Sequence, residues 1–117
     1  MSEDVKLEIV RISREFNELL PLFLDHLENY EGEIIPHIFF ADLCRFILDL
    51  DVSSDLVSRV LNKLESKFSI IEDDPTSNAI AVSFVEHLPN KTKHHWIIDK
   101  LGEKMKYHYD EVFTVKA

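Results

Sequence analysis

Six histidines have the widest chemical range of any side chains in this 117-residue sequence. Metal-binding helices carry ligands three or four residues apart, because those spacings place both side chains on one face. His108 and Glu111 have such a spacing, but in the reverse of the usual Glu-x-x-His order. The neighbours in Glu86-His87 and in His94-His95 would point about 100° apart on a helix. The pattern favours histidines that face solvent or cap helices, and it predicts no metal site. A hydrolase using histidine, carboxylates and a metal ion stays an alternative, which metal analysis would test.

The sequence gives little support for a catalytic nucleophile or for nucleotide binding. None of the serines lies in a Gly-x-Ser-x-Gly turn, and the single cysteine, Cys44, lies in an apolar run. Two isolated glycines cannot form the glycine-rich loops that hold phosphates. The acidic clusters do not follow the EF-hand pattern for calcium. We therefore expect no catalytic residue, no metal ligand and no cofactor.

Charge is the most informative feature. The chain has 22 acidic and 13 basic residues, a formal net charge of −9. Residues 1–58 contain 13 acidic and four basic residues, 4 − 13 = −9, whereas residues 59–117 contain nine of each. A negative field of this kind repels phosphate, which argues against nucleic acid or an anionic membrane as a direct partner.

Six acidic residues of the N-terminal half form a ridge, in a segment that contains no basic side chain. Its members are Glu15, Glu18, Asp25, Glu28, Glu31 and Glu33. We take this acidic ridge, with Tyr30 as an aromatic anchor and the loop Glu72, Asp73 and Asp74 as a second contact, as the candidate protein-binding site. A solvated surface would have the same composition.

Apolar spacing is helical along nearly the whole chain. Val5, Ile9, Ile12 and Phe16 predict a helix over 3–20, which Pro21 should end or kink before a second helix over 21–30. Gly32 is placed to close that second helix. Pro36 should open a third helix, which extends to about residue 50.

The C-terminal half continues in the same way. We expect helices from Ser53 or Ser54 to Phe68, up to Leu88, over 96–101 and over 105–113, with 69–72 as a helix end and 72–77 as a loop. The predicted fold is one all-α domain, 1–117, of six to seven antiparallel helices. Apolar spacing leaves open whether they form an irregular bundle or a short stack of helix pairs. The polar, acidic first residues and the lack of a long apolar run favour a cytoplasmic protein.

A resemblance adds to this interpretation. The helix that ends in Asn78-Ala79-Ile80-Ala81-Val82-Ser83-Phe84-Val85-Glu86-His87-Leu88, followed by Leu101-Gly102 and a helix with Tyr109, resembles small acidic all-helical bacterial proteins. The similarity covers about residues 56–112. Among these proteins are immunity proteins of contact-dependent growth inhibition systems. The resemblance implies a cytosolic partner of a basic nuclease toxin, and it implies no catalytic residue.

We therefore expect an immunity protein, an antitoxin whose acidic ridge covers the active-site cleft of a cognate toxin domain. A helical adaptor or regulatory module that binds proteins through an apolar groove is the alternative. The sequence leaves the oligomeric state and the toxin's identity undetermined.

Overall fold

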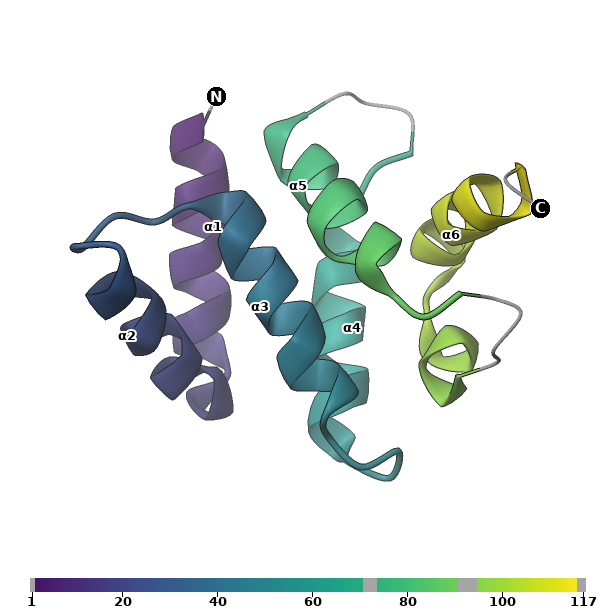
Figure 1. Ribbon diagram of the computed structural model, residues 1–117, viewed down its shortest axis with the longest axis horizontal. Helices are drawn as coiled ribbons and strands as arrows, with labels where there is room; N and C mark the ends of the chain where they lie inside the picture. The colour runs from purple at the N-terminus through teal and green to yellow at the C-terminus, as the bar shows by residue number, and fades with distance from the viewer. Residues whose placement is uncertain (1, 71–73, 91–94, 116–117) are drawn as a thin grey trace.

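The computed structural model describes residues 2–70, 74–90 and 95–115, and within these ranges the chain is all-α, without a strand (Figure 1). The α-helices are α1 Ser2–Glu15, α2 Leu20–Asn29, α3 Pro36–Leu48, α4 Asp55–Lys67, α5 Pro75–Ser83 and α6 Glu103–Val115. Short 3-10 helices are η1 Asn17–Leu19, η2 Val85–His87 and η4 Trp96–Lys100. The predicted fold class is confirmed, and the Cα radius of gyration of 13.8 Å is that of a compact chain.

The first predicted helix ends five residues before its expected limit. Phe16 has extended dihedral angles, φ −111° and ψ 101°, and α2 starts after η1 with Pro21 in its first turn. A continuous helix would bring the Pro21 ring against the carbonyl of Asn17. The chain therefore ends α1 before this clash, and the buried Phe16 side chain packs into the core instead.

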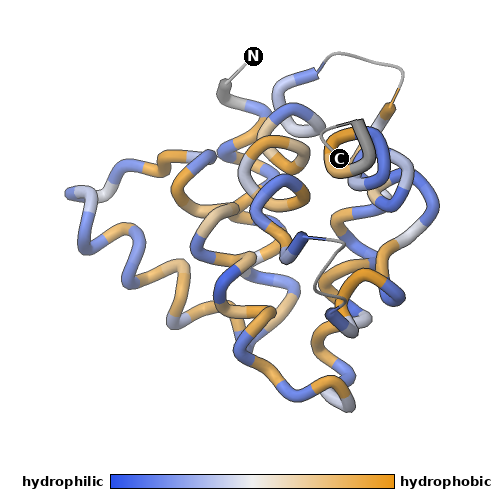
Figure 2. Tube along the Cα trace, turned by 45° about the vertical axis from the view of Figure 1, so that its right-hand side comes forward, coloured by the Kyte–Doolittle hydropathy of each residue, from blue (hydrophilic) through white to orange (hydrophobic). Residues whose placement is uncertain are grey.

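The core lies around α5. This helix packs against α1 and α3, which come from distant parts of the sequence, and against the preceding helix α4. Buried side chains include Ile9 and Ile12 of α1, Phe39 and Leu43 of α3, and Ile80 of α5. Figure 2 shows the expected alternation of apolar and polar residues along the helices. The helices therefore form an irregular bundle in which each contributes one apolar face.

Two later elements differ from their predicted form. The predicted helix up to Leu88 is divided into α5 and η2, and residues 96–100 form a 3-10 helix. Ser54 occupies the N-cap position of α4, but its side chain makes no capping hydrogen bond. Ser69 and Ile70 follow α4 outside any helix, and Ile71 to Asp73 fall outside the described residues.

Candidate functional site

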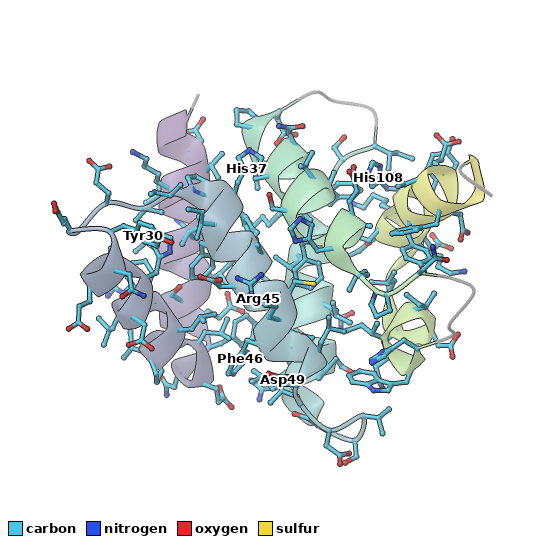
Figure 3. The ribbon with its side chains drawn as sticks, in the orientation of Figure 1. Tyr30, His37, Arg45, Phe46, Asp49 and His108 are labelled. Atoms are coloured by element: carbon cyan, nitrogen blue, oxygen red, sulfur yellow. The ribbon has the colours of Figure 1, made fainter. Side chains whose placement is uncertain are left out.

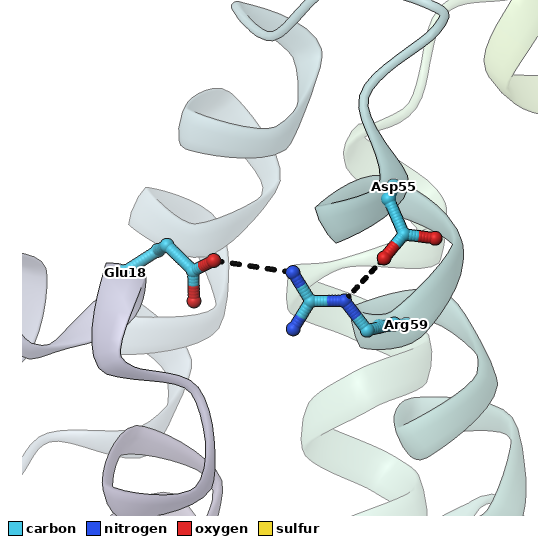
Figure 4. A network of polar contacts seen from close by, with 3 residues as sticks. All are labelled: Glu18, Asp55 and Arg59. Carbon is cyan, nitrogen blue, oxygen red and sulfur yellow. Dashed lines mark hydrogen bonds and ion pairs between the residues drawn. The ribbon is translucent and has the colours of Figure 1, made fainter.

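The acidic ridge is divided by the fold into two groups. Glu15 and Glu18 face α4, where their carboxylates pair with Lys63 Nζ at 2.9 Å and with Arg59 Nη2 at 3.1 Å. Arg59 Nε also contacts Asp55 Oδ2 at 2.8 Å, so one guanidinium bridges two carboxylates (Figure 4). A backbone hydrogen bond, and then the bond from Arg59, hold the pKa of Glu18 below its ordinary value. These two acids therefore have partners on α4, and their role in binding a partner protein stays a prediction.

The second group belongs to α2 and the turn after it. Asp25, Glu28, Glu31 and Glu33 are exposed, and none makes an ion pair with another described residue. The same helix exposes Leu20 and Leu24, which are 41% and 53% accessible. Because Leu20, Leu24 and Glu28 are four residues apart, they form one line along the helix. We call the two leucines and the four acids together the α2 face.

The turn at the end of α2 has a specific backbone geometry. Gly32 N–H donates to Leu27 O at 2.7 Å across five residues, the long hydrogen bond of a Schellman motif. Glu31 takes the left-handed position of this motif with φ 55°, and Gly32 follows with φ 83°. Gly32 does close α2 as predicted, but the strained position is filled by a glutamate. This conformation presents Glu31 on the outside of the molecule.

His26 lies beneath that turn. Its side chain is only 2% exposed, and its Nε2 accepts a hydrogen bond from Ile35 N–H at 3.0 Å. The imidazole lies 5.0 Å from the Tyr30 ring and 5.8 Å from the Phe39 ring, centroid to centroid. Burial lowers the pKa of His26, and the nearby charge of Asp42 opposes this shift. His26 is thus a neutral buried acceptor, and for this residue the predicted solvent-facing or capping role is wrong.

Tyr30 and Asp74 both contact other residues of the protein. Tyr30 is half-buried beside His26, with part of its side chain accessible (Figure 3). Asp74 caps α5 by accepting hydrogen bonds from Ser77 N–H at 2.8 Å and Ser77 Oγ at 2.9 Å. Glu72 and Asp73 lie outside the described residues. The Asp74 carboxylate is thus engaged in capping α5, and its role as a partner contact stays a prediction.

Two histidines each pair with a residue from a distant segment of the sequence. His37 Nδ1 lies 2.6 Å from Ser83 Oγ, and His108 Nε2 lies 2.9 Å from Glu86 Oε2. Ser83 is only 4% exposed, which leaves little room for a substrate carbonyl to approach its hydroxyl. The first pair therefore connects α3 to α5, whereas the second lies beside a pocket that is described below. Neither pair could be found from the linear spacing of the residues.

The family comparison gives one match. Residues 9–114 match the family described as "Domain of unknown function (DUF7674)". The chain belongs to this family. The match covers the α2 face and nearly the whole described fold, and the family's description gives no activity. No curated protein and no solved structure matches the chain.

Three further observations describe this family member. Among the described residues, no group of three or more His, Cys, Asp and Glu side chains is arranged to hold a metal ion. No helix in the described ranges is long and apolar enough to cross a membrane. Cys44 is buried, which raises the pKa of its thiol to about 12. A thiol in this state behaves as a small apolar side chain, as the sequence predicts.

Proposed function

We propose that this protein is a non-enzymatic immunity protein that binds a basic nuclease toxin domain and blocks its active-site cleft. The α2 face is the observation that supports it. This surface combines acids that have no ion-pair partner among the described residues with two exposed leucines. The proposal includes a cytoplasmic location, where an incoming toxin would act.

The two components of the α2 face would have different effects on binding. Exposed carboxylates attract a basic partner over a distance and raise association rates about 10- to 1000-fold at low salt. Exposed leucines lose water only on contact, so their burial slows dissociation. A nuclease cleft is basic because it binds phosphates, and this makes it complementary to such a surface.

The experiment first identifies a gene for a nuclease toxin domain beside the gene of this chain, then co-expresses the two products and measures growth and association kinetics. The test variant is Asp25→Lys with Glu28→Lys, and the matched control is Asp49→Lys with Glu103→Lys, which changes two exposed acids elsewhere. We expect the test variant to associate at least about tenfold more slowly and to protect less, while the control keeps its rate. Full protection by the test variant at physiological salt would contradict the proposal.

The adaptor alternative has its own structural basis. A pocket of about 340 Å³ between α1, α3 and α5 is lined mostly by apolar atoms of Val5, Pro36, His37, Pro75, Asn78 and Ala79. A peptide with an apolar side chain could dock there. Its affinity would depend only weakly on salt, in contrast to binding at the α2 face.

A further inference from the structure

A second pocket lies at the other end of the molecule from the α2 face. It has a volume of about 200 Å³ and is formed where the end of α4, helix α5 and helix α6 meet. Figure 3 shows His108 at this end and Tyr30 at the opposite end. The lining residues that matter for its chemistry are Phe68, Asn78, Tyr107, His108 and Glu111.

The Glu86–His108 pair determines how the imidazole faces this pocket. Glu86 Oε2 lies 2.9 Å from His108 Nε2, and a carboxylate can only accept the hydrogen bond. In the neutral imidazole the proton is therefore on Nε2, which leaves a lone pair on Nδ1. Nδ1 has no hydrogen-bond partner among the described residues. Glu86 is thus a positioning residue for a histidine that lines the pocket and keeps one ring nitrogen as an acceptor.

The other lining residues supply further hydrogen-bond acceptors and aromatic rings. Glu111 lies one helical turn from His108, is exposed, and has no ion pair among the described residues. The Asn78 side chain supplies an amide oxygen from α5. Phe68 is buried with its ring edge-on to His108 at 6.0 Å, whereas the Tyr107 side chain is 53% exposed. No lysine or arginine is among the lining residues.

We propose that this pocket binds a planar organic cation of the guanidinium class. A guanidinium can donate two parallel hydrogen bonds to the Glu111 carboxylate and further hydrogen bonds to His108 Nδ1 and the Asn78 amide oxygen. Its weakly hydrated faces can stack on the aromatic rings, which a compact, strongly hydrated ammonium does less well. The inference is independent of the α2 face, because it uses other residues on other helices.

The test is a titration of the full chain followed by NMR. Agmatine represents a free small guanidinium, N-acetyl-arginine amide represents an arginine side chain of a peptide, and butylamine and acetate are the comparison ligands. We expect saturable shifts of the Phe68 and Tyr107 signals with a Kd of about 1 mM, the scale for so few atoms. Butylamine should bind at least about fivefold more weakly, and acetate should not bind.

Variants then locate the site. Glu111→Gln should weaken guanidinium binding at least about tenfold, as should His108→Phe, which removes the acceptor. Glu103→Gln, an equal charge change at an exposed position on the same helix, should leave the Kd unchanged. Binding of N-acetyl-arginine amide shows that the pocket accepts an arginine borne by a peptide, and binding of agmatine alone identifies a free cation. Absence of saturation, binding of acetate instead, or an equal loss in Glu103→Gln would overturn the proposal.

Discussion

At the scale of single residues, His26 is the most informative side chain. It is buried against Tyr30 and Phe39, and its Nε2 must stay unprotonated to accept the hydrogen bond from Ile35 N–H. This bond attaches the chain after the acidic turn to the middle of α2. Protonation of Nε2 would replace the acceptor by a donor and place a charge in an apolar site. The order of the turn is therefore coupled to the charge of one imidazole.

The stability of the fold should consequently depend on pH through His26. Its pKa is lowered from 6.5 in the folded state, so the unfolded chain binds more protons below that value. The stabilisation is fully present above pH 6.5 and is lost as the pH falls toward the lowered pKa. We expect the urea midpoint of the wild type to fall across this window and that of His26→Gln, whose amide oxygen can accept from Ile35 N–H, to fall less. Equal slopes would show that His26 does not cause the dependence.

Glu31 is the other residue whose conformation requires explanation. L-residues with a Cβ are disfavoured at φ 55° by about 1 kcal/mol or more, yet a glutamate occupies this position at the tip of the acidic turn. Glycine is the usual residue there. Stability alone does not explain a glutamate at this position; under the proposed function, its charge faces the toxin domain.

The substitution Glu31→Gly should therefore stabilise the protein by about 0.5–1 kcal/mol, measured by urea unfolding at neutral pH. Glu33→Gly removes the same charge where the backbone has no positive φ, and we expect it to destabilise. If both variants changed stability in the same direction, the effect would come from charge and not from backbone strain. Under the proposed function, Glu31→Gly should also associate with the toxin domain more slowly than the wild type.

At the scale of elements, α6 depends on a residue from a different helix. Glu65 of α4 accepts hydrogen bonds from Lys104 N–H at 2.7 Å and from Met105 N–H at 3.0 Å. The carboxylate thus supplies the N-terminal cap of α6, where a negative charge also suits the helix dipole. Gly102 permits this contact, because a Cβ there would lie 2.6 Å from Glu65 Cγ. The sequence predicts a helix that ends at Leu101, directly before Gly102, and gives no sign of the contact with Glu65.

Gly102→Ala should therefore destabilise the protein through Glu65. The added methyl group displaces the carboxylate and leaves two N–H groups of α6 without it, at a cost of about 1–3 kcal/mol in urea unfolding. In a Glu65→Ala background the same substitution should cost much less, because nothing remains to be displaced. Additive losses in the double variant would contradict this account.

At the scale of the whole molecule, the fold redistributes the charge of the N-terminal half. Ion pairs with Arg59 and Lys63 of α4 engage Glu18 and Glu15, while the α2 face keeps its acids without such partners. Exposed ion pairs contribute little to stability, so their main effect is on the shape of the electrostatic field. The four acids of the α2 face belong to α2 and its turn, the pocket belongs partly to α6, and these two helices lie at opposite ends of the molecule (Figure 1). Two separate binding events are thus physically compatible.

The sequence by itself determined the fold class, most helix positions and the buried state of Cys44. These follow from local properties, because helical spacing of apolar residues and proline geometry act within a few positions along the chain. The sequence also located the acidic segment that contains the α2 face. It placed Glu15 and Glu18 in the same surface because no local pattern indicates their ion pairs with α4.

Only the tertiary structure decided which acids are paired, that His26 is buried, and that Glu86 and His108 meet beside a pocket. Each of these features joins side chains from separate helices, and their proximity depends on how the helices pack around α5. Packing is set by the fit of many side chains at once, whereas spacing in the sequence fixes only which face of each helix turns inward. The pocket beside α6 is made by such long-range contacts, because a pocket, like an ion pair between helices, requires residues that the chain brings together only when it folds.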